Sequence, residues 1–266
     1  MTTAAAAAAS ASRPMKLPGK RNVIAIASGK GGVGKTWFSI TLAHALAQAG
    51  KRTLLFDGDL GLANVDVQLG VTPRRDLAGV VAGHFALGEA AAPYPDGGFD
   101  IIAGRSGSGS LGTIPLTRLV ALRSELQALS QQYDWVVLDL GAGLERPVRI
   151  LASQTRACFV VATDEPTSIT DAYAFIKVTA RDGLTEDIRI VVNMAASPRD
   201  GERTYGTLRK ACQEFLKFEP PLAGIVRRDD KVKDAIRRQT SLLTRHPSSD
   251  AARDVEAIAE TVSRLD

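Results

Sequence analysis

The residues with the clearest chemical potential form a glycine-rich octapeptide at positions 29–36, with the sequence GKGGVGKT. Gly29, Gly34, Lys35 and Thr36 satisfy the pattern G-x-x-x-x-G-K-[ST]. An apolar run that predicts a buried strand precedes the octapeptide, and apolar residues at helical spacing follow it. A strand, a glycine loop and a helix in this order are the context in which the pattern binds phosphate, so we predict a nucleotide-binding loop.

Each part of this loop has a chemical reason. Glycine lets successive backbone N–H groups curl around a polyphosphate, and the N-terminus of the following helix adds its positive dipole end. We expect the Lys35 ammonium to reach the β- and γ-phosphates and the Thr36 hydroxyl to ligate Mg²⁺. The remaining cofactor-binding residues of the loop are Gly29, Lys30, Gly31, Gly32, Val33 and Gly34. A chance glycine-rich turn is the alternative, and the flanking elements disfavour it.

Lys30 is a second lysine where a phosphate loop needs only one. A lysine at this position distinguishes the deviant Walker A motif, so the segment resembles the MinD/ParA class of ATPases. The resemblance implies ATP and Mg²⁺ as cofactors and a homodimer formed with ATP. It also implies that Lys30 crosses the dimer interface to the partner's phosphates and acts in catalysis together with Lys35. Without the resemblance, Lys30 would be interpreted as a solvated surface lysine.

Three aspartates, Asp57, Asp59 and Asp66, lie within ten residues after the second expected strand. Such a cluster is commonly a solvated turn. The sequence DGDLGLANVD, however, resembles the switch I segment of MinD-like ATPases. The resemblance implies that Asp59 orients the attacking water close to the Mg²⁺ ligands, and that Asn64 lies near the phosphates. A positioning carboxylate suits phosphoryl transfer, whose transition state is loose. We interpret Asp57 and Asp66 as structural or helix-capping.

Four apolar residues followed by Asp139 have the Walker B form, in which a carboxylate at the end of a central strand holds Mg²⁺. An aspartate that starts a turn is the alternative. The following residues resemble switch II, which implies that Gly141 contacts the nucleotide. Leu140 departs from this resemblance, because the family carries a small or hydroxylated residue there.

Asn193 ends another expected strand, and the resemblance implies that it recognises adenine, which an amide can do as donor and acceptor. Asp229 corresponds to the aspartate of a segment that completes the adenine pocket. Arg227 departs from the family pattern, because it stands where the family often has proline.

Short apolar runs alternate with amphipathic segments from residue 21 onward, which predicts an α/β fold. Together with the phosphate loop it predicts a single-domain P-loop NTPase whose mostly parallel, twisted sheet has helices on both faces. The expected strands are 22–28, 52–57, 100–103, 135–140, 157–163, 188–193 and 222–226. The expected helices are 35–49, 116–132, 168–181, 202–216, 231–238 and 250–265. The glycine-rich segment 104–112 is expected to be a loop.

Composition is that of an ordinary globular protein, with 266 residues, 45% hydrophobic, and a net charge of +4. Residues 1–20 are expected to form a disordered Ala/Ser-rich tail, and residues 21–266 the ATPase domain. The two cysteines, Cys158 and Cys212, are too few and too far apart for a disulfide framework or a zinc site and fit a reducing cytoplasm.

A run at positions 164–177, DEPTSITDAYAFIK, resembles the FlhG/FleN branch, which controls flagellar number and placement. The resemblance implies a FleQ-type transcription regulator or an FlhF-type GTPase as partner, and leaves open transient recruitment to the cell pole or inner membrane. Residues 1–20 lack the element with which some members stimulate that GTPase.

Two alternatives remain open at this stage. A ParA-like protein would hold DNA nonspecifically through the basic segment 227–238, where a solvated helix face is the default interpretation and DNA is not the favoured partner. An inert module would dimerise with ATP and never hydrolyse it. Peripheral membrane contact is also disfavoured, because the last expected helix carries acidic residues on its polar face and should close the domain instead.

Overall fold

A single sheet organises the chain in the computed structural model, which describes residues 22–59, 61–104, 114–153, 155–185 and 187–265. Within these residues the strand order is β3-β4-β2-β5-β1-β6-β7-β8. All neighbouring strands pair in parallel except β3, which is antiparallel to β4. The strands are β1 Val23–Ser28, β2 Thr53–Gly58, β3 Ala92–Tyr94, β4 Phe99–Ile102, β5 Trp135–Ala142, β6 Ala157–Ala162, β7 Ile188–Ala195 and β8 Leu222–Arg227.

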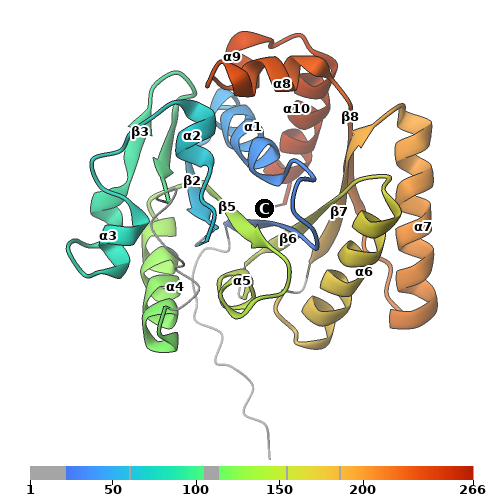
Figure 1. Cartoon of the computed structure of the whole chain (residues 1–266), viewed down its shortest axis with the longest axis horizontal. Helices are drawn as coiled ribbons and strands as arrows, with labels where there is room; N and C mark the ends of the chain where they lie inside the picture. The colour runs from blue at the N-terminus through green and yellow to red at the C-terminus, as the bar shows by residue number, and fades with distance from the viewer. Residues whose placement is uncertain (1–21, 60, 105–113, 154, 186, 266) are drawn as a thin grey trace, which may run out of the picture.

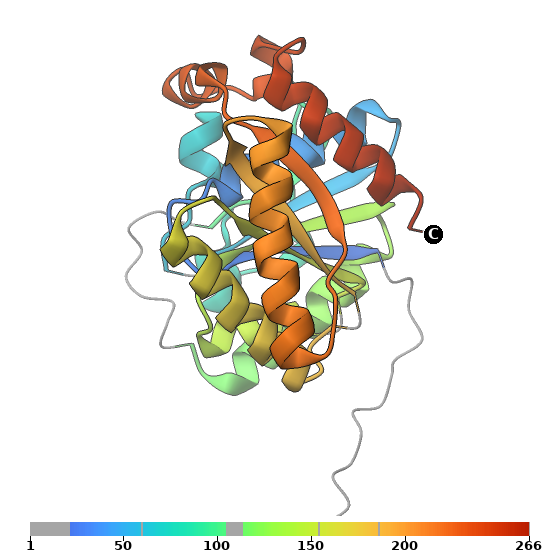
Figure 2. The same ribbon diagram turned by 90° about the vertical axis from the view of Figure 1, so that its right-hand side faces the viewer.

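Helices cover both faces of this sheet (Figure 1). On one face α1 and α10 pack against each other and against the sheet, with α2, α8 and α9 beside them. The opposite face carries α3, η1, α4, α5, α6 and α7. Figure 2 shows the long α7 beside β8, the last strand of the sheet. The helices are α1 Lys35–Gln48, α2 Val65–Leu69, α3 Leu77–Val81, η1 Leu87–Ala90, α4 Leu116–Ser130, α5 Arg146–Ala152, α6 Pro166–Arg181, α7 Pro198–Leu216, α8 Asp230–Arg237, α9 Leu242–Arg245 and α10 Asp250–Ser263.

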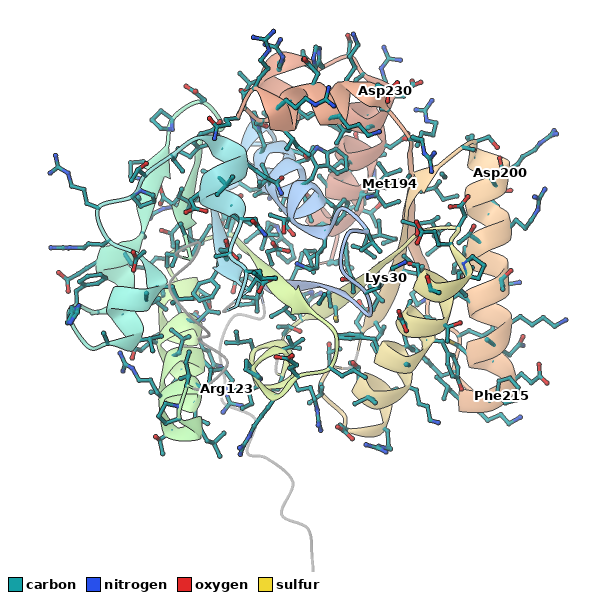
Figure 3. All side chains as sticks on the ribbon, in the orientation of Figure 1. Lys30, Arg123, Met194, Asp200, Phe215 and Asp230 are labelled. Atoms are coloured by element: carbon teal, nitrogen blue, oxygen red, sulfur yellow. The ribbon has the colours of Figure 1, made fainter. Side chains whose placement is uncertain are left out.

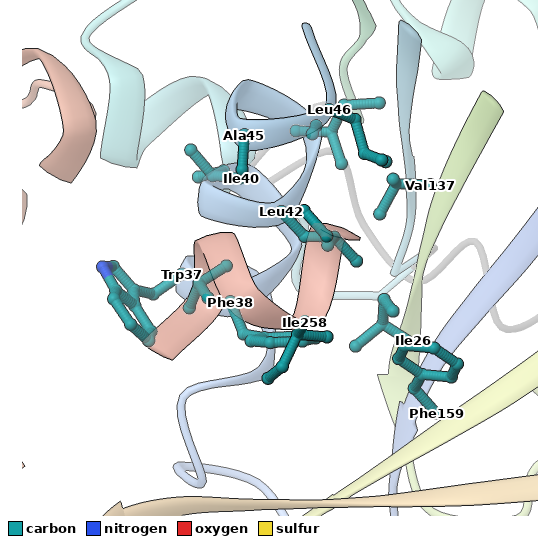
Figure 4. Packing of buried hydrophobic residues seen from close by; sticks show 14 of the residues in the cluster. Ile26, Trp37, Phe38, Ile40, Leu42, Ala45, Leu46, Val137, Phe159 and Ile258 are labelled. Atoms are coloured by element: carbon teal, nitrogen blue, oxygen red, sulfur yellow. The ribbon is translucent and has the colours of Figure 1, made fainter. Parts of the chain in front are cut away.

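The alternation of side chains along the strands divides the core into two layers. In β1, Ile24 and Ile26 point towards α1 and α10, whereas Ala25 and Ala27 point to the opposite layer. Both layers exclude water from the central strands, which explains why β1, β5 and β6 are continuous apolar runs. Figure 4 shows Ile258 of α10 packed beside Phe38 and Leu42 of α1, on the same face of the sheet. This packing fixes the start of α1, and with it the glycine-rich loop.

The predicted fold class is confirmed: a mostly parallel sheet with helices on both faces. Each expected strand and long helix is present, with ends that shift by a few residues. The sequence analysis missed β3 and the short helices α2, α3, η1, α5 and α9, which are too brief to give a periodic signal. The tail 1–20 and residues 105–112 of the expected loop lie outside the described residues.

The last helix behaves as expected. Its apolar stripe, with Val255, Ile258 and Val262, is buried against α1 and β8. That stripe therefore closes the domain against its own core. Within the described part of the chain, no helix combines the length and apolar character needed to span a membrane.

Candidate functional site

The glycine-rich loop joins the end of β1 to the start of α1, at the sheet edge where the parallel strands have their carboxyl ends (Figure 1). Gly32 and Gly34 have φ values of 81° and 84°, a left-handed conformation that residues with a Cβ rarely adopt. Gly34 is the N-cap of α1 and provides no side chain there, and the fully described first turn of α1 has no acidic residue. The helix N-terminus therefore presents N–H groups and a positive dipole end to an anion.

Close packing fixes both ends of the loop. A Cβ on Gly29 would lie 2.1 Å from the backbone oxygen of Asp171 in α6, so only glycine lets the loop approach this helix. A Cβ on Gly34 would lie 2.5 Å from Nδ2 of Asn193. The Ser28 hydroxyl donates to the Lys30 carbonyl at 2.9 Å, which shapes the first turn. The loop is thus held between α6 and β7.

Lys35 and Asp139 form a buried ion pair at the centre of this edge. Lys35 Nζ lies 2.9 Å from Asp139 Oδ1, and the two side chains are 8% and 1% exposed. The Ser39 hydroxyl lies 3.0 Å from the same oxygen. Asp139 Oδ2 is buried and has no hydrogen-bond partner among the described residues. The sequence analysis predicted Lys35 and Asp139, and missed Ser39.

Asp57 stands beside Asp139, since the two residues are register partners in β2 and β5. Its carboxylate accepts hydrogen bonds from the backbone N–H groups of Asp59, Asn64 and Val65, so it caps the turn that starts α2. The structural role expected for Asp57 is therefore confirmed. Burial and, after it, the negative charge of Asp139 raise the pKa of Asp57 to about 7, against the opposing effect of the hydrogen bonds.

Asp59 follows β2 and faces switch II. Its Oδ1 accepts from the N–H groups of Gly61 and Leu62, at 3.2 and 2.9 Å. The same oxygen lies 3.5 Å from the position that a Cβ on Gly141 would occupy, so Asp59 and Gly141 are neighbours. Asn64 is exposed, and its amide donates to the Leu62 carbonyl.

Lys30 lies over α6 of its own chain, near the centre of the face seen in Figure 3. Its Nζ is 2.6 Å from Glu165 Oε2 and 2.9 Å from Thr167 Oγ1. The side chains of Lys30 and Glu165 are 36% and 62% exposed, so this ion pair is largely in water. Lys30, followed by the positive charge of Arg228, holds the pKa of Glu165 below its usual range.

The remaining predicted residues divide into two groups. Asn193 is buried at the loop and donates to the Val33 carbonyl at 2.8 Å. Asp229 instead caps α8, since its carboxylate accepts from the N–H of Lys231 at 2.9 Å. The structure therefore brings Asn193 to the phosphate loop, and the observed contacts of Asp229 are helix caps.

The two departures from the family pattern have structural explanations. Arg227 points to α10, where its guanidinium contacts Asp254 at 2.8 Å and Asp250 at 3.0 Å, and its backbone N–H also donates to Asp254. These contacts join the end of β8 to the start of α10. Leu140 is fully buried in the layer beneath β5, so its side chain belongs to the core.

A magnesium ion suits the donors at this edge. Asp139 offers the buried and unpartnered Oδ2, Thr36 offers a half-buried hydroxyl at the start of α1, and Asp59 is near switch II. Carboxylate and hydroxyl oxygens are the ligands that Mg²⁺ prefers, usually with several waters retained. Among the described residues, no three carboxylate, histidine or cysteine side chains cluster as a complete metal cage. The arrangement fits a metal shared with phosphate.

Comparisons with known proteins identify the family of this chain. Residues 24–242 match the CobQ/CobB/MinD/ParA nucleotide binding domain. The chain belongs to this family. It is therefore a P-loop ATPase, and the expected cofactors ATP and Mg²⁺ agree with the family.

Two curated relatives confirm the expected resemblance to the FlhG/FleN branch. The chain is 39% identical over 240 residues to the antiactivator FleN of Pseudomonas aeruginosa, covering 90% of this chain and 85% of FleN. It is 30% identical over 250 residues to the flagellum site-determining protein YlxH of Helicobacter pylori, covering 93% and 84%. The septum site-determining protein MinD of Pyrococcus horikoshii, solved with Mg-ADP, shares the fold with a TM-score of 0.75 and 23% identity, covering 92% and 96%.

The sequence analysis missed three features of the site: Ser39, the pairing of Glu165 with Lys30, and the place of Asp57 beside Asp139. Ser39 follows Lys35 by four residues, and that helical spacing was the available signal. Glu165 lies 135 residues from Lys30 and gave no such signal.

Proposed function

We propose that this chain is an ATP-dependent, dimerising switch ATPase that regulates flagellar number, flagellar placement or flagellar gene expression. Its similarity to FleN and YlxH over most of each chain supports the flagellar assignment. The observation that carries the nucleotide chemistry is the buried Lys35–Asp139 pair beside an open helix N-terminus. The output would be reversible binding of a partner, so turnover should be slow.

The residues of the site divide the work of hydrolysis. Backbone N–H groups from Gly31 to Thr36 would bind the polyphosphate, and Lys35 would move from Asp139 to the β- and γ-phosphates. Asp139 and Thr36 would hold Mg²⁺, which neutralises charge on the phosphates. Asp59 would orient the attacking water, with Asn64 and Gly141 beside it. Asn193 would recognise adenine next to the loop that it already contacts.

The role proposed for Lys30 requires a second subunit. In the single chain its ammonium contacts Glu165 and Thr167, and to reach a partner's phosphates it must leave both. Because this pair is mostly in water, solvent and salt weaken it, so the lysine can be released. We propose that ATP in two facing sites supplies the stronger anionic partner.

The partners proposed by resemblance are a FleQ-type transcription regulator and an FlhF-type GTPase, and the place of action is the cytoplasm. A pull-down with the hydrolysis-deficient Asp59→Ala variant tests them, since ATP would hold that variant in its binding state. Recovery of neither partner from a flagellated cell, under conditions in which the variant retains ATP, would contradict the flagellar output.

Light scattering tests the dimer. The wild-type protein should double its mass with ATP and Mg²⁺, and Lys30→Ala should remain a monomer. Lys210→Ala is a matched control, because Lys210 is exposed on α7 away from the loop. ATP-dependent dimers in Lys30→Ala at wild-type strength would refute a lysine that acts across the interface. Phosphate release by the wild type, absent in Asp59→Ala, separates an ATPase from an inert module.

A DNA-binding output is the second candidate, and one observation favours it. Lys231, Lys233, Arg237 and Arg238 are all exposed on or next to α8. Arg227, part of the same basic run, is instead paired with α10. A DNA-retention assay with ATP decides this case: affinity that falls steeply with salt and is lost in Arg237→Ala/Arg238→Ala would favour DNA.

A further inference from the structure

Ser39 occupies an unusual place for a helix serine. It lies in α1, one turn after Lys35, and its side chain is fully buried. Its hydroxyl oxygen is 3.0 Å from the Lys35 carbonyl and 3.0 Å from Asp139 Oδ1. A hydroxyl has one proton, and an ionised carboxylate is a stronger acceptor than a peptide carbonyl. The Ser39 hydroxyl therefore donates its proton to Asp139 and not to the Lys35 carbonyl.

The carboxylate of Asp139 needs a fixed orientation. Rotation about its terminal torsion is broad and roughly two-fold, so without specific donors the plane of the carboxylate is poorly fixed. Lys35 and Ser39 both donate to Oδ1, and Oδ2 has no partner among the described residues. The neighbouring Asp57 is itself a carboxylate and adds like charge when ionised. Two donors on one oxygen leave the other oxygen available as a ligand.

Nucleotide binding would affect these two hydrogen-bond donors differently. Lys35 would leave Asp139 for the phosphates, whereas Ser39 is fully buried within α1 and stays in place. We infer that Ser39 is a positioning residue that keeps Oδ1 of Asp139 against α1 in the nucleotide-bound state, and so leaves Oδ2 available to hold Mg²⁺. This inference rests on the proposed nucleotide and magnesium site.

The same helix contains a control. Thr41 is also fully buried, and its hydroxyl donates to the Trp37 carbonyl at 2.9 Å, four residues back along the helix. Thr41 has no hydrogen bond to a carboxylate in the described structure. Ser39→Ala and Thr41→Val each delete one buried hydroxyl from α1. Only the first removes a donor from Asp139.

The test measures magnesium dependence. Binding of a fluorescent ADP is titrated at increasing Mg²⁺ for the wild type, Ser39→Ala and Thr41→Val, and again in EDTA without metal. Loss of one hydrogen bond to a charged group should raise the half-saturating Mg²⁺ concentration of Ser39→Ala about tenfold, equal to about 1.4 kcal/mol. Its affinity for ADP in EDTA should stay within about twofold of wild type, and Thr41→Val should match wild type in both.

Other outcomes overturn the inference. Unchanged half-saturation in Ser39→Ala would show that Asp139 needs no second donor, and an equal loss of affinity in EDTA would show a general packing effect. If Ser39→Ala unfolds, Ser39→Cys keeps the size with a weaker donor and should shift half-saturation in the same direction. If the wild type binds ADP with no dependence on magnesium, the proposed magnesium site itself is refuted. The wild-type titration alone reveals this outcome.

Discussion

Replacing Lys35 by methionine should destabilise the nucleotide-free protein as well as abolish nucleotide binding. The Lys35 side chain is 8% exposed, and its ammonium lies 2.9 Å from Asp139 Oδ1. Asp57, fully buried in the next strand, adds a second carboxyl group to the same region. Methionine preserves most of the side-chain volume and removes the charge, so the two carboxyl groups would lose their nearby cation.

The magnitude follows from the burial of this pair. Removing one member of a buried ion pair costs about 3–5 kcal/mol, because the other charge remains desolvated and unpaired. The cost should also depend on pH. The pKa of Asp57 is raised from 3.8 to about 7, so the folded state takes up its proton more readily than the unfolded chain does. Stability from this group is therefore lost as pH rises from about 4 to about 7, and Lys35→Met should be more damaging at pH 8 than at pH 5.

Urea unfolding in EDTA, followed by circular dichroism, measures this effect. Lys210→Met is the control at an exposed lysine, and it should unfold with the wild type. The double variant Lys35→Met/Asp139→Asn should lose at least 1 kcal/mol less than the sum of the single variants, since the two residues contact each other. A loss below about 1 kcal/mol for Lys35→Met at pH 8, or strict additivity, would refute a stabilising buried pair.

Three further predictions concern the scaffold of the site. Burial lowers the pKa of His44 from 6.5 to about 4, so stability should be lost as pH falls through this window, by about 3 kcal/mol at most. Urea unfolding of His44→Gln should not show this loss of stability at acid pH. Gly29→Ala should lower the melting temperature of the nucleotide-free protein, because its Cβ would meet the backbone of α6, whereas Gly31→Ala, with no described atom within 4 Å, should melt with the wild type. Arg227→Ala should cost about 1 kcal/mol in low salt through loss of its contact to Asp254, and a cost that does not shrink in high salt would contradict an ionic origin.

The sequence was most informative where a residue type has few chemical uses. Glycines at fixed spacing before Lys35 and Thr36 predict a phosphate loop because few other structures need them. Asp139 and Asn193 were found since each follows an apolar run in the sequence, and parallel strands bring the ends of such runs to one edge. The predicted strands were confirmed for the same reason: their burial on both faces makes them continuous apolar runs.

Contacts between distant segments could not be predicted this way. β3 is three residues long and includes Pro93, so its pairing with β4 depends on the sheet edge that already exists. The short α3 is held by the Asp76 side chain, which accepts from the N–H of Gly79. Lys30 meets Glu165 only because Gly29 lets the loop approach α6.

The charges at this edge explain why a metal should accompany the nucleotide. Asp57 and Asp139 are neighbours in adjacent strands, Asp59 lies beside Gly141, and in the described single chain Lys35, through Asp139, is the only cation paired with any of the three. Lys30 forms its ion pair with Glu165 instead. A triphosphate alone would therefore meet more carboxylate than ammonium, and like charges at short range repel strongly in a buried site. Because Mg²⁺ offsets that excess, nucleotide affinity should fall sharply in EDTA, and replacing Asp139 by asparagine should weaken the dependence on metal.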